Sequence, residues 1–275
     1  MKRIIAAFVI LCSLSLPAQE KGRWVKGKAS VFGTDFGKMQ TEAVKRARAD
    51  ALNQAGIVVS ASSFRVQTED NKNLNDYYSQ FSEATSRGII TDERNIRISD
   101  PVRVSGTQAK GERMFQIDAE LEAFVVIPAG TADAGFTVAV QSNKSTFREH
   151  EPVTLAITPS KDGYVTIFHV KNDTIQIPFP NALSRNNKVT AKKKFVFPTD
   201  YELYLTIDGA DKTSVEEFIV VVTKEDIAAA DIGDAKIVGD ELLLPKMTMT
   251  ELSRWLSKIP LNIRTMGYVV LTVVR

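Results

Sequence analysis

The residues that could perform catalysis in this chain are few and scattered. His150 and His169 are the two histidines, and Cys12 is the single cysteine. Neither histidine has a second ligand at the i, i+4 spacing that pairs metal ligands on a helix. No Gly-x-Ser-x-Gly turn is present to expose a serine nucleophile. The sequence therefore predicts no catalytic residue, no metal and no cofactor.

One stretch imitates a phosphate-binding loop, Gly33-Thr-Asp-Phe-Gly37-Lys38. A phosphate loop needs four residues between its glycines and a Ser or Thr after the lysine, whereas this stretch has three and then Met39. We therefore expect a strand-to-helix turn here. The 33 acidic residues make accidental carboxylate pairs common. A carboxylate-based hydrolase acting at a domain junction stays open as an alternative, as does a soluble ligand carrier.

Two short segments are candidates for contacting a partner. In Ile177-Pro-Phe-Pro-Asn181 the prolines cannot donate to a sheet, so a strand must end there. Phe179 then either caps a core, which burial of the ring favours, or is exposed as an anchor. The run Lys192-Lys-Lys194 is either a solvated turn that blocks edge pairing or a contact for an anionic polymer. The interaction candidates are Phe179, Asn181, Arg185, Lys192, Lys193 and Lys194.

The first eighteen residues predict an export signal. Lys2 and Arg3 precede the apolar stretch 4–11, and Ala18 is a small residue at the expected cleavage point. The stretch is too short to span a membrane, so no transmembrane segment is expected in the mature chain. Cys12 lacks the preceding small residues of a lipidation site, which makes lipidation the less favoured alternative. We expect an exported protein of the periplasm or outer membrane.

The charge balance argues against nucleic acid as a partner. Loss of Lys2 and Arg3 lowers the basic residues from 35 to 33, against 33 acidic residues. A neutral chain has no extended basic field to attract a nucleic acid backbone. The mature chain would also lack cysteine, which suits a bacterial envelope protein better than a disulfide-stabilised eukaryotic one.

Residues 19–127 predict an α+β domain, an antiparallel sheet with two helices. Alanines recur every fourth residue through 40–55, with Thr41 as the expected N-cap and Gly56 as the helix end. A second helix is expected at 74–86. The expected strands are 24–32, 57–66, 89–104 and 114–127.

A polar, aperiodic linker at 128–135 separates this domain from a second one at 136–275. Short strands separated by turns predict an antiparallel β-sandwich there, with a late helix at 249–259 and a last strand at 268–274. The other expected strands are 136–140, 152–158, 164–170, 174–177, 188–197, 201–207 and 215–223.

Both halves resemble known families. The alanine-rich helix running into Gly56-Ile-Val-Val-Ser, followed by Ser86-Arg-Gly-Ile-Ile, resembles the N-terminal domain of the flagellar assembly protein T family and related small envelope lipoproteins. Asp162-Gly-Tyr-Val-Thr-Ile-Phe, followed by Phe179-Pro-Asn181, resembles a bacterial domain-of-unknown-function family of envelope and peptidase-linked proteins over residues 136–225. These resemblances imply assembly or surface roles. We expect a non-catalytic protein that binds an envelope protein or polysaccharide.

Overall fold

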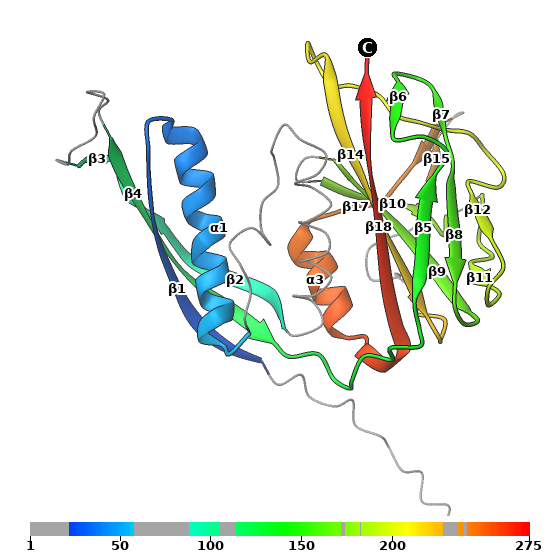
Figure 1. Cartoon of the computed structure of the whole chain (residues 1–275), viewed down its shortest axis with the longest axis horizontal. Helices are drawn as coiled ribbons and strands as arrows, with labels where there is room; N and C mark the ends of the chain where they lie inside the picture. Colours follow the sequence, from blue (N-terminus) through cyan, green and yellow to red (C-terminus); the bar gives the residue numbers. More distant parts are fainter. Residues whose placement is uncertain are drawn as a thin grey trace, which may run out of the picture.

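The computed structural model describes residues 22–57, 88–104, 114–171, 174–181, 183–227, 236–238 and 241–275. Most of these residues lie in β-strands, and two α-helices occur among them, α1 (Phe36–Gln54) and α3 (Met249–Ser257). Figure 1 shows α1 with one set of strands on the left and the remaining strands with α3 on the right. The expectation of a β-rich chain is confirmed. The expected signal segment, the strand at 57–66 and the helix at 74–86 lie outside the described residues, apart from Ile57.

The N-terminal sheet is antiparallel, with β4 (Phe115–Val126) at its centre. One neighbour is β1 (Gly22–Gly33), and the other side holds β2 (Ile89–Ile98) and β3 (Val102–Arg103). The single strand expected over 89–104 is therefore interrupted at 99–101. Pro101 has no N–H to give to a ladder, which accounts for the break.

Helix α1 covers one face of this sheet. Its alanines let it lie close to β1, where a Cβ built on Gly27 would be 2.0 Å from the Ala47 carbonyl oxygen. The expected N-cap at Thr41 is wrong, because the helix begins at Phe36 and its N-cap is Asp35. The Asp35 side chain accepts a hydrogen bond from the Lys38 N–H at 3.2 Å and caps it there. Gly56 follows the helix with a φ of +88°, as expected.

The C-terminal half contains a seven-stranded sheet. Along its main path the order is β17 (Lys246–Met247), β10 (Thr174–Phe179), β9 (Gly163–Lys171), β14 (Thr213–Thr223), β18 (Arg264–Val274) and β6 (Thr146–Arg148). β11 (Lys188–Val189) also pairs with β9. The strands β9 and β14 are central, which explains why both of their faces are apolar. The final strand returns to this sheet, as expected.

A three-stranded sheet lies beside it, in the order β12 (Phe195–Phe197), β8 (Leu155–Pro159) and β5 (Val138–Ser142). Two short pairs complete the strands: β7 (Pro152–Val153) with β13 (Leu203–Tyr204), and β15 (Lys236–Val238) with β16 (Glu241–Leu243). The strand expected over 188–197 is wrong, since β11 and β12 belong to different sheets. Lys192 lies between them with a φ of 60°, which turns the chain from one sheet to the other.

Two apolar clusters stabilise the C-terminal half. The first joins the two larger sheets and contains Leu155, Ile167, Phe179, Phe197 and Phe218, among others. The second lies on the opposite face of the seven-stranded sheet, where α3 packs. A capping box between Thr248 and Glu251 starts this helix, and Pro260 follows its end.

The two halves are in direct contact. Ile89 of β2 belongs to the same apolar cluster as α3, and Arg254 of α3 donates a hydrogen bond to the Thr91 carbonyl at 3.1 Å. The segment between the halves is also fixed: Asp133 Oδ2 lies 2.6 Å from Lys161 Nζ and 2.7 Å from Lys224 Nζ. The expected linker at 128–135 thus contains bends and a turn, forms no strand or helix, and has defined contacts.

Candidate interaction surface

The Phe-Pro-Asn corner is part of the folded core. The Phe179 side chain is 1% exposed and packs against Phe195 and Phe197, with ring centroids 5.4 and 5.6 Å apart. Core capping, the favoured alternative for Phe179, agrees with this burial. The same strand ends at the Phe179-Pro180 bond, which is cis. This ring is therefore enclosed and does not present an anchor at the surface.

Asn181 is also buried, and it organises the corner through hydrogen bonds. Its Oδ1 accepts from the N–H groups of Leu183 at 2.8 Å and Ser184 at 2.9 Å. Its Nδ2 donates to the Pro178 carbonyl and, at 3.1 Å, to the Tyr201 hydroxyl. Tyr201 donates in turn to the Pro178 carbonyl at 2.9 Å, and burial raises the pKa of its hydroxyl to about 12. The short polar side chain thus satisfies two backbone N–H groups and one carbonyl beyond the end of the strand.

The lysine run forms a turn that is anchored by its backbone. The Lys192 N–H donates to the Pro159 carbonyl at 2.7 Å, and the Ala191 N–H donates to Asp162 Oδ1 at 2.7 Å. The Lys193 N–H donates to the Thr190 carbonyl at 3.1 Å. A lysine with positive φ is disfavoured by its Cβ, so these bonds must hold it there. The three lysine side chains consequently project from a fixed turn.

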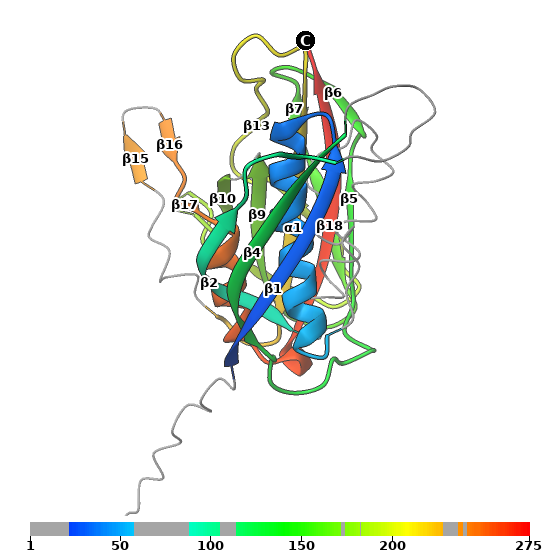
Figure 2. The ribbon, with the colours of Figure 1, turned by 90° about the vertical axis from the view of Figure 1, so that its left-hand side faces the viewer.

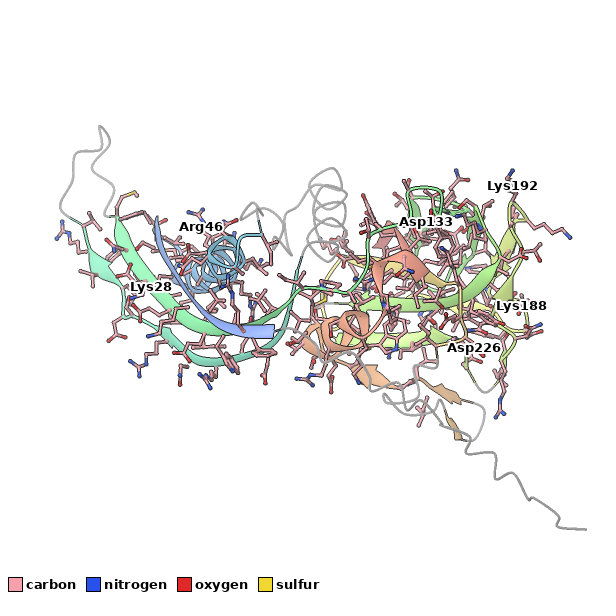
Figure 3. The ribbon with its side chains drawn as sticks, turned by 90° about the horizontal axis from the view of Figure 1, so that it is seen from below. Lys28, Arg46, Asp133, Lys188, Lys192 and Asp226 are labelled. Atoms are coloured by element: carbon pink, nitrogen blue, oxygen red, sulfur yellow. The ribbon has the colours of Figure 1, made fainter. Side chains whose placement is uncertain are left out.

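These lysines belong to a longer segment, 185–194, whose charged residues are all basic. We call it the basic turn, and it comprises Arg185, Lys188, Lys192, Lys193 and Lys194, all exposed. No Asp or Glu occurs from residue 174 to residue 199. None of its five cations takes part in an ion pair in the described part of the chain. Figure 3 shows Lys188 and Lys192 at the outer edge of the C-terminal half, away from α1.

The histidines do not assemble a nucleophile and base. His169 Nε2 lies 2.7 Å from Glu216 Oε2, and Ser214 Oγ donates to Glu216 Oε1 at 2.6 Å. The carboxylate therefore separates the hydroxyl from the imidazole, whereas a triad needs the imidazole against the hydroxyl. His169 is buried with its Nε2 paired to Glu216, and His150 is exposed.

Sequence reasoning missed the consecutive acids Glu216 and Glu217, which are both buried in β14. The sequence contains one indication of this burial, because the two acids directly precede the apolar run Phe218–Val222. Glu217 Oε2 has no hydrogen-bond partner, and burial raises the pKa of this carboxyl to about 8. Adjacent acids on the exposed face of a strand are common, so the local sequence did not indicate that both would be buried.

The described ranges contain no group of three or more His, Cys, Asp or Glu side chains arranged to hold a metal ion. Across the same ranges, neither helix has the length and hydropathy needed to cross a membrane.

Comparison with known proteins identifies one region. Residues 146–226 match the family described as a domain of unknown function, DUF4384. This agrees with the resemblance expected for the C-terminal half, and the matched region contains both the Phe-Pro-Asn corner and the basic turn. The curated proteins contain no match to the chain.

Proposed function

We propose that this chain is an exported, non-catalytic protein of the bacterial envelope that binds an anionic envelope polysaccharide through the basic turn. The N-terminal half would be the α+β domain and the C-terminal half the β-sandwich expected from the sequence. The observation that carries the proposal is a set of five exposed cations that form no ion pair among the described residues, three of them on an anchored turn.

Electrostatics supports a polymeric anion as the partner. Elsewhere on the surface most cations are close to acids, as Lys28 is to Glu120 and Arg94 to Glu122. Cations already paired within the chain contribute little field at a distance, whereas the unpaired cations of the basic turn add together. A chain with repeated negative charges can contact several of them at once, which a single small anion cannot do.

The site also has the rigidity that binding requires. Its backbone is held by hydrogen bonds to Pro159 and Asp162, which lie in and after β8. A fixed backbone lowers the entropy lost when a partner orders the side chains. Lysine side chains remain free to adapt to the spacing of charges on the polymer.

The direct test is a charge reversal in the turn. The variant Lys192→Glu, Lys193→Glu, Lys194→Glu should bind heparin, used as a polyanionic polysaccharide, about 10- to 100-fold more weakly than the wild-type chain at roughly 0.1 M salt. Neutral dextran should bind neither protein. The matched control is Lys38→Glu, Lys212→Glu, Lys246→Glu, which makes the same change in net charge at exposed positions outside the turn.

Equal loss of binding in both triple variants would show a net-charge effect and would refute the basic turn as the site. Fractionation of cells tests the location separately. Recovery of a chain that begins at Gln19 in the periplasmic or outer-membrane fraction would support export, and recovery of the full-length chain in the cytoplasm would refute it.

A further inference from the structure

The face of the N-terminal sheet that points away from α1 carries charges in stripes. Figure 2 looks onto this face, with β1, β4 and β2 side by side and α1 behind them. Lys26 and Lys28 lie on β1, opposite Glu122 and Glu120 of the central strand β4. On its other side β4 pairs with β2, where Arg94 is opposite Glu122 and Arg97 is opposite Glu120. The result, which we call the striped face, is an acidic stripe between two basic ones.

The stripes are close enough to interact within the chain but remain open to solvent. Lys28 Nζ lies 2.5 Å from Glu120 Oε1, and Arg94 Nε lies 2.7 Å from Glu122 Oε2. The Lys28 and Glu120 side chains are nevertheless 63% and 52% exposed. A shallow groove in this face is lined by Lys26, Lys28, Asn95, Arg97, Glu120 and Glu122, among others. Exposed pairs of this kind are weak, so their members can take a second partner at small cost.

An aromatic group closes one end of the striped face. Trp24 of β1 is opposite Phe124 of β4, with ring centroids 5.4 Å apart. The Arg94 guanidinium lies 4.0 Å from the centroid of the Trp24 ring, which is still 37% exposed. Tryptophan and arginine are the residues most enriched among those that dominate protein interfaces. This end offers apolar area beside the charges.

Two contacts oppose attachment of another strand at the sheet edges. The Asp50 side chain of α1 accepts the Lys28 N–H at 2.9 Å, and Arg254 of α3 donates to the Thr91 carbonyl at 3.1 Å. Without these contacts, the Lys28 N–H and the Thr91 carbonyl would be free to pair with an added strand. A partner therefore has easier access to the face of the sheet than to its edges.

We propose that a second copy of this chain packs on the striped face. A two-fold axis parallel to the strands, running between β1 and β4, would place each β1 over β4 of the other copy. Lys26 then faces Glu122 of the second copy, Lys28 faces its Glu120, and Trp24 faces its Phe124. Every contact occurs twice, because a two-fold interface uses the same patch on both copies. An acidic stripe beside a basic stripe is complementary to itself in this arrangement.

The interface of this dimer would be small. Strands twist, so two facing sheets stay aligned only near their crossing point. An interface built on two strands therefore falls at the small end of stable interfaces, and we expect a dissociation constant of about 1 to 100 µM that rises with salt. Sedimentation velocity across this concentration range should show a monomer–dimer equilibrium.

Charge reversal provides the decisive test. Lys26→Glu, Lys28→Glu makes both stripes of the pair acidic, and Glu120→Lys, Glu122→Lys makes both basic. Each variant alone should be monomeric at concentrations where the wild-type chain dimerises, with affinity reduced about tenfold or more. Mixed in equal amounts, the two variants should form a heterodimer, because each acidic stripe then faces a basic one.

The fourfold variant, with all these changes in one chain, restores opposite charges between β1 and β4, both within a copy and between copies, and should dimerise. It loses the favourable charges opposite Arg94 and Arg97, so its affinity should fall between those of the wild type and of the double variants. Circular dichroism of each variant checks that the fold is retained. A wild-type chain that stays monomeric at 500 µM, or a mixture that stays monomeric while the wild type dimerises, would overturn the proposal. So would a dimer that neither double variant weakens, since it would form through another surface.

Discussion

Glu216 and Glu217 are consecutive residues of the central strand β14, yet their carboxyl groups lie on opposite faces of the seven-stranded sheet. Glu216 is in contact with His169, Ser214 and, at 3.7 Å, Lys171. Glu217 is opposite Val170 and Val270 in the ladders and has a carboxyl oxygen without a partner. One carboxyl is surrounded by donors, and the other is placed among apolar side chains.

This contrast predicts an unusual dependence of stability on pH. Burial raises the pKa of Glu217 to about 8 in the folded chain, so the folded chain holds this proton more tightly than the unfolded one. Its contribution to stability is present in full below the ordinary value of 4.5 and is lost as the pH rises to about 8. In Glu217→Gln this part of the pH dependence should disappear. Urea unfolding at about pH 5, 6.5 and 8 measures the slope.

The absolute stability of Glu217→Gln is a separate matter, because a buried amide without partners costs about 1–3 kcal/mol. The wild type and Glu217→Gln are therefore compared by how steeply the free energy of unfolding of each falls with pH. If the wild type and the variant lose the same free energy of unfolding between the lowest and highest pH, then Glu217 does not titrate as the structure implies.

Glu216→Gln should lower the free energy of unfolding by about 3 kcal/mol at neutral pH, since it removes the buried charge that His169 and Ser214 contact, whereas Lys171 keeps Asp208 at 3.1 Å. Ser214→Ala removes one hydrogen bond to the same carboxylate and should cost about 1 kcal/mol. Chemical denaturation of both variants measures the two losses. A Glu216→Gln loss no larger than that of Ser214→Ala would show that the charge of Glu216 is unimportant.

Asn181→Ala should destabilise the Phe-Pro-Asn corner. The N–H groups of Leu183 and Ser184 lose their acceptor, and we expect a loss of about 2–3 kcal/mol. Tyr201→Phe removes only the hydroxyl that donates to the Pro178 carbonyl and should cost about 1 kcal/mol. Thermal unfolding of the two variants compares them. Equal, small shifts in melting temperature would contradict the role assigned to Asn181.

Asp133→Asn should weaken the connection between the halves. The hydrogen bonds and charges of Lys161 and Lys224 hold the pKa of Asp133 below its ordinary value of 3.8. Its contribution to stability is therefore present above that value and is lost as the pH falls below it. Melting temperatures at about pH 7 and pH 3 should differ less in Asp133→Asn than in the wild type. Asp226→Asn is the control, because Asp226 is exposed; an equal change there would refute the prediction.

Gly27→Ala and Gly37→Ala should have opposite effects. A Cβ at Gly27 would meet the Ala47 carbonyl oxygen at 2.0 Å and push α1 off the sheet, at a cost of about 1–3 kcal/mol or more. The nearest atom to a Cβ at Gly37, in the first turn of α1, is 3.7 Å away, and alanine favours the helix there. Denaturation midpoints should fall for the first variant and stay level or rise for the second. A tolerated Gly27→Ala would contradict the close packing of α1.

The local features of this protein could be read from its sequence. Alternation along 115–126, the alanine spacing in α1 and the apolar spacing in α3 all act over a few residues, so the elements they predict are present. The prolines around Phe179 likewise ended a strand, because proline lacks an N–H wherever it stands. The run of three lysines could also be predicted to be exposed, because a charged side chain is costly to bury wherever it stands.

Only the tertiary structure decided which segments meet. It divided 188–197 between two sheets, buried Glu216 against His169 from a strand 47 residues away, and joined Ile89 to the cluster under α3. It also aligned the acids of β4 between the cations of β1 and β2. Local patterns fix how a residue faces its own strand or helix, whereas contacts between distant segments depend on packing of the whole chain, which no short window of sequence contains.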